Sequence, residues 1–275
     1  GGAELVGNGG YTKYNSLQLE LRKRLSAGLQ FNASYVFGKA YTSSRYSLRT
    51  PRVKTLQTGT EGGVTHALKA NWTYELPFGQ GRRFGSGAGP VLDRIIGGWS
   101  FDGIARIQSG RMLDFGNVRL VGMSVEELQD MFKLRFDDAG KVIYMLPQEV
   151  IDETVKAFSV SATSATGYSS LGAPSGRYIA PANGPDCIEI AQGYGDCGLR
   201  SVVVTGPRLV RFDLSAVKRI PIKGRVNAEF RAEFLNAFNH PWFSPVTGAG
   251  DDPDDFRVTG ADSGRQVQLV WRLNW

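Results

Sequence analysis

The chain has 275 residues, of which 41% are hydrophobic, 21% are charged and 35 are glycines, and its formal net charge is +6. This apolar content excludes a disordered chain, and the glycines lack the period of three that collagen requires. Apolar runs stay well short of a membrane-spanning helix, and the basic residues are scattered, so we expect no nucleic-acid partner.

Apolar and polar residues alternate along seven stretches of the chain. In the first stretch, Gln18 and Glu20 separate Leu17, Leu19 and Leu21, which is the pattern of a strand with one apolar face. The predicted strands are 14–25, 28–38, 64–76, 99–108, 208–220, 225–238 and 265–275. They exceed the mean of about 5–6 residues for globular strands and match the roughly 9–11 residues of a strand that crosses a bilayer.

The two faces of these strands differ in charge. Lys23 and Lys218 are the exceptions on the apolar faces, each close to a strand end, where a lysine can extend toward water. The opposite faces are polar, as expected for a membrane barrel with lipid outside and water inside. The charged residues expected to face the lumen are Arg211, Asp213, Glu229, Arg231 and Glu233. They either pair with one another across strands or hold a lumen plug and line a solute path.

Short and long connections alternate. Residues 26–28 and 221–224 form tight turns and 78–98 a longer one, whereas 39–63, 109–206 and 239–264 are long. Outer-membrane barrels have short periplasmic turns and long extracellular loops. Seven strands would then end on the side opposite to their start, whereas complete bacterial barrels have an even number. We therefore expect the C-terminal part of a larger barrel.

One long loop contains a folded insertion. Ser124 and Glu127 have the spacing of a capping box at a helix start. A turn at 137–140 and a second helical pattern after Pro147 follow. We predict a small α/β cap, a helix–hairpin–helix insertion over 121–158, in an extracellular loop, and an irregular loop over 159–206.

Few residues could carry chemistry. Cys187 and Cys197 favour a disulfide in an oxidising compartment, with two free thiols as the alternative. His66 and His240 are the two histidines, and neither lies in a catalytic motif. The acidic run 251–255 lacks the glycine of a calcium loop, so we favour a solvated loop over a calcium site. We expect no enzyme activity, cofactor or metal.

Several local motifs resemble the barrel of TonB-dependent outer-membrane receptors, in the family that often carries a carboxypeptidase-regulatory-like N-terminal domain. The resemblance extends from about Tyr11 to Trp275. The matching segments are 74–79 with 81–84, which resemble a periplasmic turn, 97–100, 108–111, 230–234 and 236–241. Trp271, Leu273 and Trp275 resemble the C-terminal signal for barrel assembly.

The resemblance implies a location in the bacterial outer membrane and a barrel of about 22 strands around a plug. It also implies uptake of a scarce large solute, powered by the TonB complex through an N-terminal region. The implied partners are membrane lipid, the plug and remaining strands, the barrel assembly machinery and an unidentified solute. One alternative is a small closed barrel acting as porin or adhesin, with 255–259 as an eighth strand. Another is a secreted carbohydrate-binding β-sandwich with two sheets on one apolar core.

Overall fold

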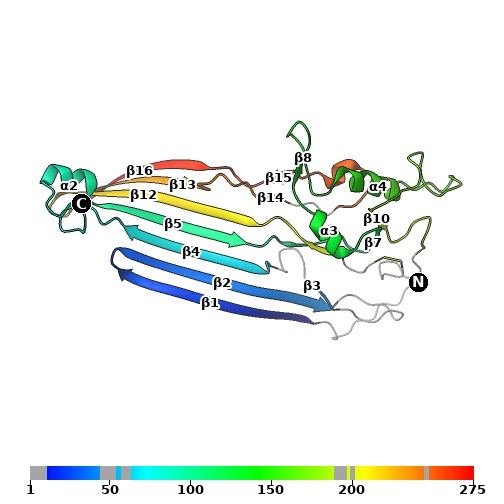
Figure 1. Cartoon of the computed structure of the whole chain (residues 1–275), viewed down its shortest axis with the longest axis horizontal. Coiled ribbons are helices and arrows are strands. Elements are labelled where there is room, and N and C mark those ends of the chain that lie inside the picture. The colour runs from blue at the N-terminus through cyan, green and yellow to red at the C-terminus, as the bar shows by residue number, and fades with distance from the viewer. Residues whose placement is uncertain (1–10, 44–53, 57–62, 189–196, 199–201, 245–247) are drawn as a thin grey trace.

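A computed structural model describes residues 11–43, 54–56, 63–188, 197–198, 202–244 and 248–275. Seven long strands form one antiparallel sheet in which each strand pairs with the next one along the chain, and a short strand, β3 (Lys54–Leu56), pairs with β2 (Figure 1). The long strands are β1 (Thr12–Ser26), β2 (Leu29–Ser43), β4 (His66–Glu75), β5 (Trp99–Gln108), β12 (Leu209–Lys223), β13 (Val226–Leu235) and β16 (Gln266–Asn274). The seven alternating stretches of the sequence are therefore strands of a single wall.

The wall has two different ends (Figure 1). At one, the turn end, lie the β1–β2 and β12–β13 hairpins and the helix α2 (Pro90–Ile96). At the other, the cap end, lie the remaining helices and short strands. Strands β1 and β16 are the two edges of the sheet, and within the described residues they do not pair with each other. The described chain is thus an open wall and not a closed barrel.

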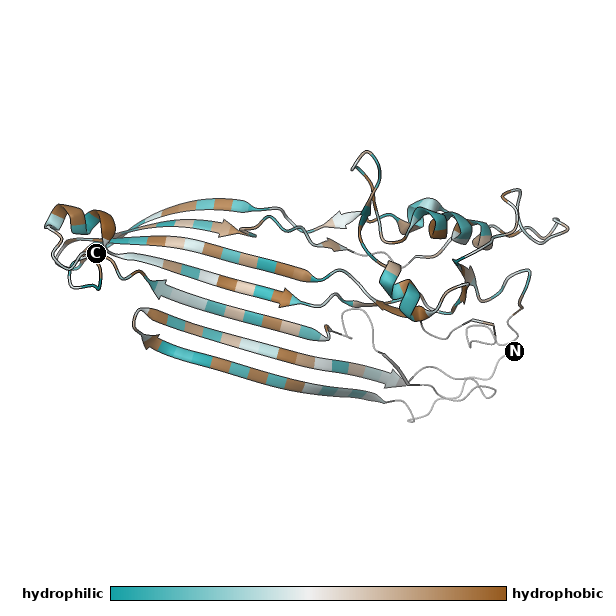
Figure 2. Ribbon diagram, in the orientation of Figure 1, coloured by the Kyte–Doolittle hydropathy of each residue, from teal (hydrophilic) through white to brown (hydrophobic). Residues whose placement is uncertain are grey.

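The strand register separates polar from apolar side chains. One row of directly paired positions consists of Glu233, Ser215, Asp102, Thr73 and Gln30, and it belongs to the polar face. The next row consists of Phe234, Leu214, Gly103, Trp72 and Phe31, and it belongs to the apolar face. Figure 2 shows the resulting alternation of hydrophilic and hydrophobic bands along every long strand.

The apolar face is open in the described structure. On β1, Leu17, Leu19 and Leu21 are 53%, 55% and 63% exposed. Gly103 allows the ring of Trp72 to lie flat on this face, since a Cβ there would be 2.1 Å from the ring. Such a continuous exposed apolar surface is suited to contact with lipid. None of the helices among the described residues is both long and apolar enough to cross a membrane.

Some element ends differ from the sequence-based expectation. β13 ends at Leu235 and not at 238, because Asn236 adopts a left-handed conformation (φ 50°) that a strand cannot contain. β2 continues to Ser43, five residues beyond the predicted end at 38. The connection 78–98 contains α2, which the glycine-rich sequence did not suggest and which begins with Pro90 in its first turn.

The cap is a folded unit of several short elements. These are β6 (Met112–Asp114), β7 (Val118–Val121), α3 (Val125–Met131), β8 (Arg135–Phe136), β9 (Ile143–Tyr144), α4 (Gln148–Phe158), β10 (Tyr178–Pro181), β11 (Val203–Thr205), β14 (Phe243–Ser244), the 3-10 helix η1 (Pro253–Phe256) and β15 (Gly260–Ala261). The predicted capping box at the start of α3 is confirmed, because Glu127 N donates to Ser124 Oγ (3.2 Å) and Ser124 N donates to the Glu127 carboxylate (2.7 Å).

The cap has its own apolar core. Leu128 of α3 and Ile151 of α4 are completely buried and pack with Ile179, Val204 and Phe256. The interpretation of 159–206 as an irregular loop is wrong in part, since β10 pairs with β7 and β11 pairs with β6. These short strands are stabilised by partners that precede the insertion, so no local pattern marks them.

The third long connection contributes to the same core. Phe256, at the end of η1, is only 3% exposed. The eighth strand that a small closed barrel would need at 255–259 is absent, because η1 overlaps this segment and β15 pairs with the short strand β14. The connection therefore joins the cap and does not extend the wall.

Candidate functional site

The five charged residues predicted to face a lumen all lie on the polar face of β12 and β13. On β13, the period of two brings Glu229, Arg231 and Glu233 to this face. Arg231 lies between the two carboxylates, at 3.5 Å from Glu229 and 3.4 Å from Glu233, and Arg219 contacts Glu229 at 3.0 Å. The charges on this part of the wall therefore compensate one another.

A shallow cavity of about 320 Å³ lies over the same face, lined by residues of β2, β4, β5, β12 and β13. Two of its lining side chains have buried polar atoms without a hydrogen-bond partner in the described structure, Asp102 Oδ1 and Arg231 Nε. One is an acceptor and the other a donor, and both atoms are buried within the described wall.

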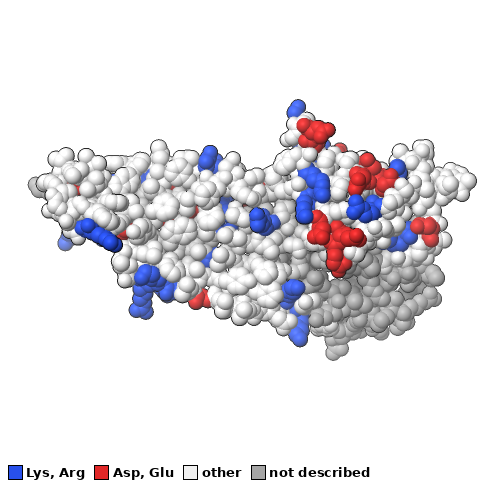
Figure 3. Space-filling model, in the orientation of Figure 1, with Lys and Arg blue, Asp and Glu red and all other residues white. Residues whose placement is uncertain are grey.

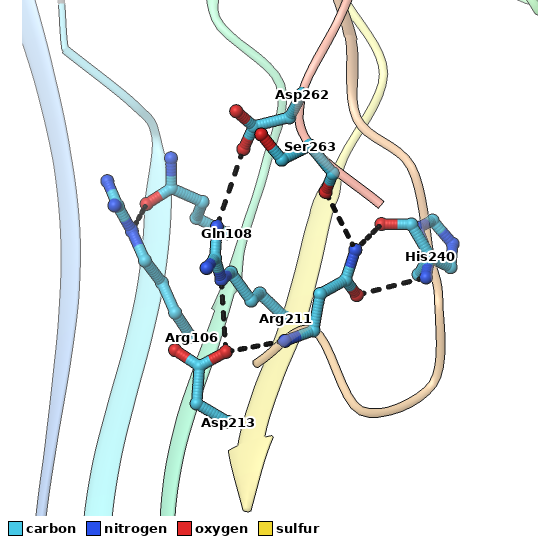
Figure 4. Close-up of polar contacts among 8 residues, drawn as sticks. Arg106, Gln108, Arg211, Asp213, His240, Asp262 and Ser263 are labelled. Atoms are coloured by element: carbon cyan, nitrogen blue, oxygen red, sulfur yellow. Dashed lines mark hydrogen bonds and ion pairs between the residues drawn. The ribbon is translucent and has the colours of Figure 1, made fainter. Parts of the chain in front are cut away.

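At the cap end, a polar network closes over this face (Figure 4). Arg211 Nε donates to Asp213 (3.2 Å), and another guanidinium nitrogen of Arg211 lies 3.6 Å from Asp262. Arg106 Nε donates to the side chain of Gln108 at 2.9 Å. The Arg211–Asp262 contact joins β12 to the segment before β16, whereas the Arg106–Gln108 hydrogen bond lies within β5.

Asn236 is the centre of this network. Its main-chain N–H donates to Asp213 (2.7 Å), and its side chain binds the main-chain N–H and carbonyl of His240 and the carbonyl of Ser263. Only 4% of the residue is exposed. Sequence reasoning used 236–241 as a family motif and gave Asn236 no role, although asparagine is one of the few residues that accept a left-handed conformation.

Aromatic side chains surround one of the two histidines, and the other contributes main-chain hydrogen bonds. His66 lies at the cap end of β4 on the apolar face, where its Nδ1 is 2.8 Å from Tyr35 Oη and its ring is 4.9 Å from that of Phe37. The main-chain N–H and carbonyl of His240 form hydrogen bonds with the side chain of Asn236. Tyr35 and His66 have the amphipathic rings typical of a membrane interface.

On the cap, a bidentate ion pair holds the segment before the cysteines. Arg119 of β7 donates to both oxygens of Asp186, at 2.9 and 2.6 Å, and its Nε donates to the carbonyl of Pro181. The Arg119 hydrogen bond lowers the pKa of the Asp186 carboxyl. Burial raises the pKa of the neighbouring Tyr168 and Tyr178 phenols, so both stay neutral at physiological pH.

This ion pair predicts a pH dependence. Because the folded-state pKa of Asp186 is depressed, its contribution is present above about pH 4 and is lost as the pH falls through the folded value. The contribution should be below about 1 kcal/mol, because the carboxyl is 45% exposed. Amide protection factors of β10, corrected for intrinsic exchange, should fall between pH 6 and pH 3 more in the wild type than in Asp186→Asn. Equal pH dependence in both proteins would contradict this assignment.

Cys187 and Cys197 are joined by a disulfide with a Cα–Cα distance of 6.0 Å. Gly184 and Cys187 exchange two main-chain hydrogen bonds, so the bridge begins at an ordered turn. We expect the disulfide to contribute on the order of 2–3 kcal/mol to the local stability of this loop. Mass spectrometry of unreduced protein should show a two-proton deficit and no alkylation at either cysteine. Two alkylated thiols in freshly isolated protein would disprove the bridge.

The acidic run 251–255 organises its own turn. The Asp252 carboxylate accepts a hydrogen bond from Asp254 N (2.9 Å) and caps η1, and Asp254 lies 3.7 Å from Arg257. Within the described parts of the chain, acidic, histidine and cysteine side chains do not gather into a group of three or more that could hold a metal. Figure 3 shows that most visible acidic side chains lie on the cap, whereas the strand region carries scattered basic side chains and few acidic ones in this view.

The residues of the assembly-signal motif lie at the end of the sheet. Trp271 and Leu273 project from β16 on the apolar face and are 63% and 49% exposed, and Trp275 follows with 89% exposed. The Trp271 ring lies 6.4 Å from that of Phe230 on the neighbouring strand. The motif therefore forms an aromatic, solvent-accessible part of the apolar face.

Comparison with known proteins places this architecture in a family. No curated protein and no solved structure matches the chain. A family model for an outer membrane beta barrel domain matches residues 1–268. The long strands, the antiparallel pairing and the separation of polar and apolar faces agree with that assignment. The chain belongs to the outer membrane beta barrel domain family and is thus a protein of the bacterial outer membrane.

Proposed function

We propose that this chain supplies barrel wall and ligand-capturing cap to a TonB-dependent receptor that takes up a scarce large solute. The observation that carries the proposal is the combination of an open wall with a polar inner face and a folded cap at one end. Such a wall can enclose a polar path, and the cap is placed to meet a solute at its entrance. In this arrangement the cap end faces outward and the turn end faces the periplasm.

The open edges support a barrel larger than the described wall. Main-chain groups of β1 and β16 face outward from the sheet edges, and in hydrocarbon each unsatisfied group would cost several kcal/mol. Further strands of the same receptor would pair with both edges. The family resemblance implies a total of about 22 strands.

The composition of the polar face is consistent with a plug that fills the lumen. Asp102, Arg231 and Glu233 are among the charged and polar residues that line the cavity over the wall. A plug with polar side chains would be complementary to this polar face, and its rearrangement by the TonB complex would open a path. The mechanism needs binding and movement only, so we propose no enzyme activity and no cofactor.

The structure gives less support to the alternatives. A small closed porin or adhesin needs an eighth strand where η1 lies. A secreted carbohydrate-binding sandwich needs a second sheet over the apolar face, yet Leu17, Leu19 and Leu21 of that face are more than half exposed in the described structure.

Crosslinking within the intact receptor tests the proposal. A photo-crosslinking amino acid placed at Asp102 should form crosslinks to a plug segment of the same polypeptide, identified by mass spectrometry. The neighbouring position Phe101 is a matched control, because it points to the opposite face of β5. The purified receptor should also conduct few ions in planar bilayers and bind the periplasmic domain of TonB. An unplugged, continuously conducting pore that does not bind TonB would overturn the proposal in favour of a porin.

A further inference from the structure

Helix α2 is attached to the apolar side of the wall. Trp99 and Lys218 are directly paired positions of β5 and β12, and both belong to the apolar face. Trp99 Nε1 donates to the carbonyl of Ile95 (2.9 Å), and Lys218 Nζ donates to the carbonyls of Ile95 and Gly97. The C-terminal end of α2 therefore covers the apolar face at the turn end (Figure 1).

This contact corrects the sequence-based interpretation of Lys218. The residue is 6% exposed, so its ammonium group does not extend into water. It is held by two carbonyls at the end of α2 and lies 5.3 Å from the centroid of the Trp99 ring. The helix end and the aromatic ring replace water around a charge on a lipid-facing surface.

The other side of α2 is apolar and uncovered. Val91, Leu92 and Ile95 are 75%, 50% and 63% exposed, and no residue of the helix is buried. The adjacent turn adds Phe78 and Phe84, whose ring centroids are 5.6 Å apart and which are 43% and 50% exposed. Apolar side chains thus continue from the lipid-facing strands onto the helix and the turn.

Basic residues border this surface. Arg82, Arg83 and Arg94 are exposed, and the guanidinium of Arg83 lies 5.4 Å from the centroid of the Phe84 ring. An exposed apolar helix face beside arginines has the chemistry of a segment that lies in the headgroup region of a membrane with anionic lipids.

We propose that α2 and the 78–84 turn form an interfacial anchor that inserts into the phospholipid leaflet at the turn end of the wall. Val91, Leu92 and Ile95 enter the boundary between headgroups and acyl chains, and Arg83 and Arg94 contact lipid phosphates. The anchor sets the depth of the wall in the membrane. The continuity of this surface with the lipid-facing strands favours lipid over a protein partner.

Depth measurement tests this anchor in the full-length protein. A cysteine introduced as Leu92→Cys carries a nitroxide, while the native cysteines stay bonded to each other. The protein is placed in nanodiscs of phosphatidylethanolamine and phosphatidylglycerol, and collisions with oxygen and with a water-soluble nickel chelate are measured. The nitroxide should lose access to the chelate and gain access to oxygen relative to a label at Ser86→Cys, an exposed position between the turn and α2.

A label at Leu269→Cys on β16 provides the reference for full immersion, since this side chain is 67% exposed on the apolar face. Heat-modifiable migration shows that each labelled protein is folded, and Val91→Cys replaces Leu92→Cys if the latter is not. Equal chelate access at positions 92 and 86 would overturn the proposal. Protection of position 92 in cells but not in nanodiscs would also overturn it, because a protein would then cover the helix.

Discussion

Replacing Phe230 by arginine should destabilise the folded barrel by about 2–4 kcal/mol, the typical effect of a basic residue on the lipid face near the membrane centre. Phe230 lies in the row of β13 that faces the apolar side, and its ring is 6.4 Å from that of Trp271. An arginine would place a charge in hydrocarbon and remove this aromatic contact. The loss should appear as a lower urea midpoint of the heat-modifiable folded form.

The adjacent residue supplies the control. Arg231 is on the opposite face between Glu229 and Glu233, and these side chains are 12–28% exposed. Arg231→Gln keeps a hydrogen-bond donor near both carboxylates and leaves Glu229 paired with Arg219, so the loss should be much smaller than for Phe230→Arg. If both variants lose the same amount of folded barrel, the two faces of the wall do not differ in environment.

Leu128→Ala should destabilise the cap by about 2–5 kcal/mol, because the substitution leaves a cavity in a well-packed core. Leu128 is completely buried on α3 and belongs to the cluster that also contains Ile151 and Phe256. The cap should become sensitive to limited proteolysis and lose amide protection in α3 and α4. The wall should keep its heat-modifiable migration, because its own stability depends on strand pairing and lipid contact.

The matched control is Asp130→Ala on the same helix, at an exposed position. This variant raises the helix propensity slightly and removes no buried contact, so protection of the cap should remain within about 0.5 kcal/mol of the wild type. Loss of the barrel together with the cap in Leu128→Ala would show that the two parts do not fold independently.

Local patterns in the sequence were sufficient to predict the long strands of the wall. In a strand with one apolar face, side chains of the same polarity recur at every second residue. The alternation around Leu17–Leu21 or Phe230–Phe234 can therefore be recognised without knowledge of any partner strand. The capping box at Ser124 and Glu127 is equally local, since both of its hydrogen bonds span three residues. The outer membrane barrel domain, its polar face and the first helix of the cap followed from such short-range signals.

Other features depended on contacts between distant residues. β10 and β11 exist because β7 and β6 pair with them across the insertion, and their own sequences are too short to show a period. The role of Asn236 was visible only in the structure, where its side chain donates hydrogen bonds to the main-chain carbonyls of His240 and Ser263.

The position of α2 is the clearest such case. In the sequence, Lys218 was an isolated charge near a strand end, and 78–98 was a glycine-rich turn. More than 120 residues separate Lys218 from the carbonyls of Ile95 and Gly97 that bind it. The sequence by itself determined which residues share the apolar face of the wall, because apolar residues recur at every second position along each strand. Only the tertiary structure decided which groups stabilise the charge on that face, because hydrogen-bond partners far apart in the chain follow no period.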